Sequence, residues 1–278
     1  MKNKNIFDEA LITGADGVIG GYINSGIRTN HRSLDVTNLA EVMKVCSKYE
    51  PKFIIHLAAE TDVDQCERDA THAYQVNAIG TYHMALAARN ISAKLVYIST
   101  SGVFDGTKSE PYAENDIPSP RTVYAHSKYL GELAVQSLLD DYLILRIAWV
   151  FGGGPEKDQK FVAKILKQID NPIINVVSGK RGSPTYGKDL VAGMRRLIEE
   201  EGTGLYHMSN AGAPTRADVV REIVRITGSS AEVKEVSASF FGLPADAGRP
   251  DNESMSSKVA YMRPWQEALS EYIRTEWQ

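Results

Sequence analysis

The sequence predicts an α/β fold with a doubly wound parallel sheet, followed by a smaller lobe. Four short apolar runs in the first half of the chain lack polar alternation, which is typical of strands buried on both faces of a parallel sheet. Longer segments with helical spacing separate these runs, as expected when strands and helices alternate along the chain. The pattern loosens after Phe151, where shorter mixed elements begin. The four runs are residues 10–13, 53–57, 95–99 and 142–146.

Helices are predicted from apolar residues that recur three and four positions apart, in residues 39–49, 70–90 and 161–169. A further helix is expected over residues 215–227. Thr215 can cap its N-terminus, Asp218 lies in its first turn, and Gly228 follows its end. We therefore expect a large domain and a smaller α/β lobe at the C-terminal end. The large domain is expected over 1–150 plus about 171–208, and the smaller lobe over 151–170 and 209–278.

The composition excludes several classes of protein. The 31 Lys and Arg oppose 35 Asp and Glu, for a formal net charge of −4, which argues against nucleic acid or an anionic membrane as a partner. The two cysteines, Cys46 and Cys66, form no CxxC pair, so no metal site is predicted. No segment resembles a signal peptide or the roughly 20 apolar residues of a membrane span, so we expect a cytoplasmic protein.

A glycine-rich turn follows the first predicted strand. Gly14, Gly17 and Gly20 are spaced by three in the sequence Gly-Ala-Asp-Gly-Val-Ile-Gly. Such glycines permit a tight turn, a close approach of the backbone to a pyrophosphate, and close packing of a following helix whose N-terminus faces the phosphates. The turn therefore predicts a Rossmann-type dinucleotide site that leads into a helix. The alternative is a strand–helix turn that binds nothing.

The residues after the second strand indicate which nicotinamide cofactor binds. NAD-binding folds usually place an acid there to hold the ribose 2′-hydroxyl. Residues 26–33 instead contain Arg28, Asn30, His31 and Arg32, and no acid occurs before Asp35. Basic residues suit a 2′-phosphate, so we predict NADP, used as NADPH, with NAD as the alternative. The competing interpretation is a solvated basic loop.

Thr100, Tyr124 and Lys128 form a candidate constellation for carbonyl reduction. Thr100 ends a buried strand, and Tyr124 and Lys128 lie one helical turn apart in the next helix. A carbonyl that receives a hydride needs a proton, which a phenol can donate if nearby positive charge lowers its pKa. Lys128 and the nicotinamide would supply that charge, and Thr100 would hold the carbonyl oxygen. The alternative is a surface lysine beside a core tyrosine.

With these motifs in this order, the sequence resembles the extended short-chain dehydrogenase/reductase family, and within it the dTDP-4-dehydrorhamnose reductases. The resemblance covers nearly the whole chain. It is carried by residues 57–64, 99–106, 112–116, 118–120, 146–152, 181–185, 204–207 and 249–254. It implies catalytic roles for Thr100, Tyr124 and Lys128.

The resemblance also implies the ligand-binding residues. Besides Tyr124 and Lys128, the residues expected at the cofactor are Gly14, Asp16, Gly17, Val18, Ile19, Gly20, Asn30, Arg32, Asp35, Val36, Leu57, Ala58, Ala59, Thr61 and Ser99. The residues expected at the substrate are Val63, Thr100, Ser101, Trp149, Arg181 and Arg249. Trp149 as a core aromatic and Arg249 as a surface charge are the alternatives for those two positions.

By this resemblance, the expected function is NADPH-dependent reduction of the 4-keto group of a nucleotide-diphospho-4-keto-6-deoxy sugar, for deoxysugar or polysaccharide biosynthesis. The chain departs from the family at Gly102, where a tyrosine is usual, and at Val18-Ile19, where a glutamine is common. These departures leave the identity of the sugar open. The sequence also does not determine the nucleotide, whether the protein forms a homodimer, or whether a metal assists. The alternatives are a sugar-nucleotide 4-epimerase with tightly bound NAD and a regulatory subunit that binds NADP without turnover. A 4,6-dehydratase is disfavoured, because Ser101-Gly102 replaces its Asp-Glu pair.

Overall fold

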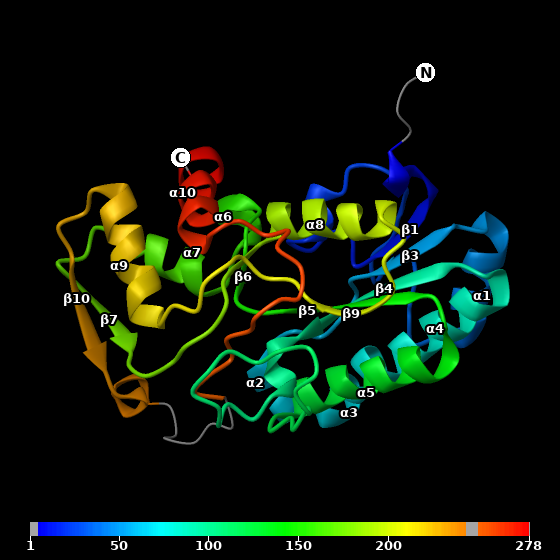
Figure 1. The fold of residues 1–278 in the computed structure, drawn as a ribbon, viewed down its shortest axis with the longest axis horizontal. Helices are drawn as coiled ribbons and strands as arrows, with labels where there is room; N and C mark the ends of the chain where they lie inside the picture. Colours follow the sequence, from blue (N-terminus) through cyan, green and yellow to red (C-terminus); the bar gives the residue numbers. More distant parts are fainter. Residues whose placement is uncertain (1–4, 243–249, 278) are drawn as a thin grey trace.

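The large lobe is built on a six-stranded parallel sheet with the strand order β2-β1-β3-β4-β5-β9 (Figure 1). A computed structural model describes residues 5–242 and 250–277. The predicted doubly wound parallel sheet is confirmed. Its strands are β1 (Ala10–Thr13), β2 (Ile27–Arg28), β3 (Phe53–His56), β4 (Lys94–Thr100), β5 (Tyr142–Ile147) and β9 (Gly204–His207).

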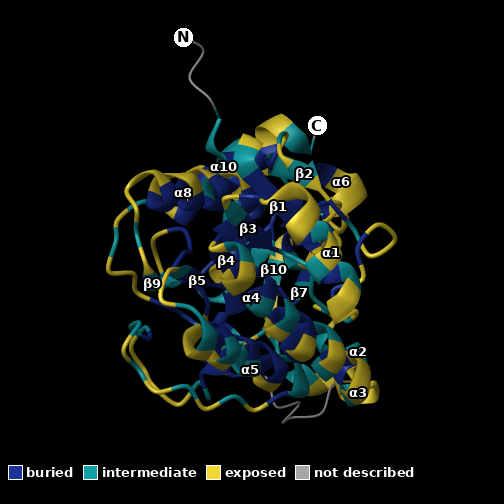
Figure 2. Cartoon of the chain, turned by 90° about the vertical axis from the view of Figure 1, so that its right-hand side faces the viewer, coloured by how far each residue is buried: buried dark blue, intermediate teal, exposed yellow. Residues whose placement is uncertain are grey.

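Helices cover both faces of this sheet. Ala10 and Ile12 of β1 pack in one core with Met194 of α8, while Leu11 packs in another core with Met84 of α4. Figure 1 shows α8 on one side of the sheet and α1, α4 and α5 on the other, and Figure 2 shows exposed residues on the outward faces of the helices. Burial on both faces explains why the strands show no polar alternation.

A nearly continuous helical segment forms where residues 70–90 predicted a helix, with the π-helical turn Gln75–Ile79 joining α3 to α4. Within the residues that the structure describes, no helix has the length and apolar character needed to cross a membrane. The helices of the large lobe are α1 (Leu39–Tyr49), α2 (Val63–Arg68), α3 (Ala70–Tyr74), α4 (Gly80–Ile91), α5 (Val123–Leu138) and α8 (Gly187–Glu199), with the 3₁₀ helices η1 (Ile6–Glu9), η2 (Gly20–Tyr22) and η4 (Ser101–Val103).

The smaller lobe has its own core, in which Phe151, Tyr186 and Tyr272 pack against one another. Thr215 and Asp218 form a capping box at the start of α9, and Gly228 ends it at φ +69°, which confirms the predicted helix. The elements of this lobe are β6 (Val150–Phe151), β7 (Ile173–Val177), β8 (Thr185–Tyr186), β10 (Glu232–Val236), α6 (Gly154–Lys157), α7 (Phe161–Leu166), α9 (Arg216–Thr227), α10 (Trp265–Glu276) and η5 (Ala238–Phe241).

The chain crosses between the lobes at other points than the sequence predicted. Strand β7 pairs with β10 in the smaller lobe, although residues from about 171 were expected in the large domain. Only Ile174 and Val176 of β7 are buried, as suits a two-stranded sheet with one wet face. The return to the large lobe begins with α8. Met262, expected in the smaller lobe, packs in the core of the large one.

The helix expected directly after the glycine turn is not formed. Residues 14–19 are turns and bends, and only the single 3₁₀ turn of η2 follows them. The connection between β1 and β2 spans residues 14–26, which is barely the dozen or so residues that a parallel crossover needs. The glycine turn and the single 3₁₀ turn take up most of this short connection, so no regular helix dipole contributes to phosphate binding here.

Candidate active site

The candidate site begins where the strand order reverses, between β1 and β3. Ligands of doubly wound sheets bind in the crevice outside the carboxyl ends of strands at such a point. Gly14 follows β1 at φ +62°, and a Cβ atom there would lie 2.7 Å from the backbone nitrogen of Ala58. The glycine turn and the loop after β3 are therefore in direct contact, and only glycine allows both the conformation and the approach.

The glycine turn is held from within by Arg28 of β2. Its guanidinium donates to the carbonyl oxygens of Gly20 and Ala15, each at 2.8 Å. Arg28 was predicted to suit a 2′-phosphate, but its guanidinium instead stabilises the glycine turn through these hydrogen bonds. Of the other basic residues in this segment, His31 and Arg32 are exposed. The predicted contact with a 2′-phosphate is therefore left to those two side chains.

A dinucleotide fits the glycine turn on structural grounds. The backbone N–H groups of Val18 and Ile19 have no hydrogen-bond partner in the part of the chain that the structure describes. Successive free N–H groups in a turn form an anion-binding concavity, even without a regular helix. Asp16 lies in the same turn, where its carboxylate accepts a 2.5 Å hydrogen bond from the Asn30 amide.

The adenine side of the predicted cofactor site lies between β2 and α1. The Asp35 carboxylate accepts two hydrogen bonds from Thr37, which lower the pKa of Asp35. Val36 is buried, and its Cγ2 would lie 2.8 Å from a Cβ placed on Gly80. Glycine at that position lets α4 approach the segment that carries Asp35 and Val36.

The loop after β3, residues 57–61, is fixed by a side chain that the sequence reasoning missed. Asn77 is fully buried in the π-helical turn. Its carbonyl oxygen accepts the Glu60 N–H at 2.9 Å, and its amide donates to the Glu60 carbonyl and to the Ser127 hydroxyl, both at 3.0 Å. Because Ser127 lies on α5, Asn77 joins the predicted cofactor loop to the helix that carries Tyr124 and Lys128. The sequence could have indicated Asn77, because it is a polar residue on the apolar face of a predicted helix.

The structure brings the three predicted catalytic residues together at the carboxyl end of β4. Thr100 is the last residue of β4, and its hydroxyl lies near enough to Tyr124, in the first turn of α5, to lower the pKa of that phenol. Thr122 caps α5 by accepting a 3.2 Å hydrogen bond from the backbone N–H of Ala125. Lys128 follows one turn later, with Nζ 4.2 Å from the centre of the Tyr97 ring of β4.

Burial controls the protonation of this site. It raises the pKa of Tyr124 to about 12, with the Thr100 hydrogen bond acting in the opposite direction. It lowers the pKa of Lys128 to about 7, opposed by the negative charge of Glu132. The predicted low phenol pKa is therefore not seen in the chain by itself, where burial outweighs every lowering contribution. Tyr124 is a protonated phenol near neutral pH, as a proton donor must be.

Glu132, one turn after Lys128 on α5, forms a buried ion pair with Arg146 and favours the charged form of Lys128. Glu132 is fully buried and accepts two hydrogen bonds from Arg146 of β5, at 2.9 and 2.7 Å. The Ser99 hydroxyl also donates to Glu132. Ser99 was expected at the cofactor, but its hydroxyl is directed to this pair. The sequence reasoning missed both Glu132 and Arg146 as members of the site.

The predicted substrate side is organised around Trp149. Its backbone has φ +40°, a left-handed conformation that costs a bulky residue about 1–3 kcal/mol. A Cβ atom on Gly182 would lie 2.2 Å from Cε2 of the indole, so the ring lies flat against that glycine. On α9, the guanidinium carbon of Arg216 lies 5.5 Å from the ring centre. The indole N–H donates to Glu253 at 3.4 Å.

The other predicted substrate residues approach this region from several elements. The Ser101 hydroxyl donates to the Glu253 carboxylate at 3.0 Å. Val63 is half-buried at the start of α2, after the exposed Thr61, whose hydroxyl accepts a 3.4 Å hydrogen bond from Lys160. Arg181 is exposed, and its carbonyl accepts the Glu253 N–H at 2.9 Å. Arg249 lies outside the described residues.

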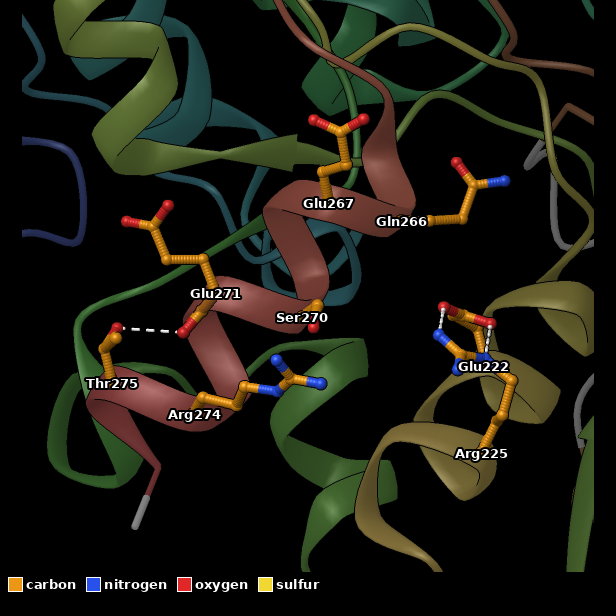
Figure 3. A pocket seen from close by; sticks show the side chains of 8 residues that line it. All are labelled: Glu222, Arg225, Gln266, Glu267, Ser270, Glu271, Arg274 and Thr275. Atoms are coloured by element: carbon orange, nitrogen blue, oxygen red, sulfur yellow. Dashed lines mark hydrogen bonds and ion pairs between the residues drawn. The ribbon is translucent and has the colours of Figure 1, made fainter.

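A separate open groove of about 540 Å³ lies between α9 and α10 (Figure 3). Its lining is mostly charged and includes the ion pair of Glu222 with Arg225, at 2.6 Å. No predicted site residue lines it, and we assign it no role in the chemistry. Among the described residues, no group of three or more His, Cys, Asp or Glu side chains could hold a metal ion.

Comparison with known proteins places the chain among sugar-nucleotide enzymes. The model of the RmlD substrate binding domain family matches residues 9–277. The spore coat polysaccharide biosynthesis protein SpsK of Bacillus subtilis is 33% identical, over 96% of this chain and 97% of that protein. The dTDP-4-dehydrorhamnose reductase structure from Clostridium acetobutylicum has a TM-score of 0.90 and 34% identity, with 95% of this chain and 98% of that chain covered. The Bacillus anthracis structure, in complex with NADP, has a TM-score of 0.88, the same identity and the same coverage.

Proposed function

Because the chain belongs to the RmlD substrate binding domain family, we propose that it is an NADPH-dependent reductase of a nucleotide-diphospho-4-keto-6-deoxy sugar. The observation that carries the proposal is the convergence of Thr100, Tyr124 and Lys128 at the carboxyl end of β4. These three residues lie on the same edge of the sheet as the glycine turn. A bound dinucleotide and a carbonyl substrate would therefore meet at this edge.

The chain's own residues divide the chemistry among them. NADPH, when bound, supplies the hydride that reaches the carbonyl carbon. Tyr124 donates its phenolic proton to the carbonyl oxygen, and Thr100 holds that oxygen by a hydrogen bond. The charge of Lys128, favoured by Glu132, stabilises the phenolate that remains on Tyr124. Asn77 keeps the cofactor loop in register with α5.

The cofactor and the sugar occupy opposite parts of the site. The glycine turn, the segment of Asp35 and Val36, and residues 57–61 hold the dinucleotide. Val63, Ser101 and Trp149 surround the sugar, and Arg181 with Arg249 serves the diphosphate. A role in deoxysugar or polysaccharide biosynthesis agrees with the name of the B. subtilis relative. The cytoplasmic location and the homodimer stay predictions.

The direct test is the oxidation of NADPH with a panel of dTDP-, UDP- and GDP-linked 4-keto-6-deoxy sugars, with product stereochemistry read by NMR. Wild-type protein is expected to turn over at least one of them. Tyr124→Phe should lose about 10²–10⁴-fold in turnover while it still binds NADPH, because only the proton donor is removed. Tyr82→Phe, at an exposed position on α4, is the matched control. Wild-type protein that oxidises NADPH with no member of the panel would contradict the proposal.

Two measurements separate the alternatives. A 4-epimerase retains NAD through its cycle, so denaturing the purified protein and identifying the released dinucleotide distinguishes it from a reductase. A regulatory subunit that only binds NADP would be unaffected in function by Tyr124→Phe.

A further inference from the structure

A glutamate occupies the substrate side of the site, where neither the glycine turn nor the catalytic constellation requires one. Its backbone is firmly held: the Glu253 N–H donates to the Arg181 carbonyl at 2.9 Å. The preceding Asn252 is buried and donates to the carbonyl oxygens of Lys108 and Glu110, at 2.8 and 3.1 Å. The position of Glu253 is thus fixed by the fold.

The Glu253 carboxylate is oriented by one donor on each oxygen. The Ser101 hydroxyl donates to Oε2 at 3.0 Å, and the Trp149 indole donates to Oε1 at 3.4 Å. A carboxylate has about four acceptor positions. Glu253 is half-buried, so it keeps acceptor capacity that a substrate can use. Both donors are residues that we place around the sugar.

The carboxylate also lies close to the reacting centre. Ser101 directly follows Thr100, whose hydroxyl lies near enough to Tyr124 to lower its pKa. The negative charge of Glu253 adds slightly to the rise in the pKa of Tyr124, as this placement requires. A carbonyl oxygen held by Tyr124 and Thr100 would therefore bring the neighbouring ring carbons toward Glu253.

The chemistry of the proposed substrate limits what Glu253 can meet. Of the two ring carbons beside the 4-keto group, C5 bears the ring oxygen and the methyl group, so only C3 can carry a hydroxyl. We propose that Glu253 accepts a hydrogen bond from the substituent on C3 and selects substrates that carry a hydroxyl there. This inference rests on the proposed reductase function. A site built to bond a hydroxyl rejects the analogue that lacks it, because its own polar group is then left without a partner.

The experiment compares a 3-hydroxy and a 3-deoxy 4-keto-6-deoxy sugar nucleotide in wild-type protein, Glu253→Gln and Glu253→Ala. Wild-type protein should favour the 3-hydroxy substrate by about 10- to 100-fold in kcat/KM, as expected for a hydrogen bond to a charged group. In Glu253→Ala, kcat/KM should fall for the 3-hydroxy substrate and stay unchanged for the 3-deoxy substrate, so the preference disappears. Glu253→Gln should keep part of it, because an acceptor oxygen remains. Asp251→Asn, which removes an exposed carboxylate from the same segment, should behave as wild type.

Three outcomes would overturn the proposal: a wild-type protein that does not discriminate, a Glu253→Ala variant that retains the preference, or an equal loss on both substrates. An equal loss on both substrates would mean that Glu253 only positions Trp149. NADPH binding and thermal unfolding of each variant show whether the fold is intact. If wild-type protein reduces neither sugar, the proposed function fails. Calorimetric binding of the same two compounds then tests Glu253 by itself, with the same preference expected in Kd and equal affinities overturning its role.

Discussion

Replacement of Lys128 by methionine is expected to stabilise the folded chain at neutral pH while it abolishes turnover. Lys128 is buried, and burial lowers its pKa from 10.5 to about 7. Between these pH values the unfolded chain binds a proton that the folded chain has released. The stability of wild-type protein therefore rises with pH through this window, and the full penalty of the buried charge applies at and below pH 7.

The structure sets the size of this effect. At about 1.36 kcal/mol for each pKa unit, the penalty has an upper limit of about 5 kcal/mol. Methionine fills a similar volume without a charge. Glu132 keeps its two hydrogen bonds from Arg146 in the variant, so the substitution leaves no buried carboxylate without a partner. We expect Lys128→Met to gain a few kcal/mol at pH 7.

Urea unfolding at a series of pH values between 7 and 9.5 measures the difference between Lys128→Met and wild type. The gain should shrink by up to about 1.36 kcal/mol per pH unit, because folded wild-type Lys128 loses its proton over this range while the unfolded chain keeps it. Lys48→Met, at an exposed position on α1, should show no such dependence. A gain that is constant with pH, or a variant less stable than wild type at pH 7, would refute the reasoning.

Three further substitutions test the supporting parts of the site. Glu132→Gln should reduce the free energy of unfolding by about 3–5 kcal/mol in urea titrations, because it leaves Arg146 buried without an ionic partner. Gly14→Ala should cost more than about 1 kcal/mol and weaken NADPH binding in fluorescence titrations, because its φ is +62° and the new Cβ meets the loop after β3. Gly182→Ala should raise KM for the sugar nucleotide in steady-state assays and leave NADPH affinity unchanged, because its Cβ would displace the Trp149 indole.

Each of these three predictions can be contradicted by a specific result. Gly179 also has a positive φ, of +73°, but a Cβ there meets nothing within 4 Å. If Gly179→Ala weakens NADPH binding as much as Gly14→Ala, the contact with the loop after β3 is not the cause. If Glu132→Gln lowers the free energy of unfolding by less than about 1 kcal/mol, the negative charge of Glu132 contributes little to stability. An unchanged KM in Gly182→Ala would remove Trp149 from the sugar site.

Local physical chemistry explains which parts of this protein were predictable. The strands β1, β3, β4 and β5 were readable because burial on both faces leaves an unbroken apolar run in the sequence. Helix α9 was readable because its capping box and terminal glycine lie within its own segment. Thr100, Tyr124 and Lys128 were found because proton transfer to a carbonyl needs these side chains at strand and helix positions that periodicity already supplied.

Tertiary structure decided the features that depend on partners far away in the chain. Glu253 meets Ser101 across 152 positions, and nothing in the sequence around either residue indicates the other. Arg28 was assigned to a phosphate from its charge, but the shortness of the β1–β2 connection turns it toward the carbonyl groups of the glycine turn. Sequence thus determined the layered fold and the residues that can transfer a proton. Only the packed chain determined their pKa values and the shape of the sugar site, because burial and long-range contacts set both.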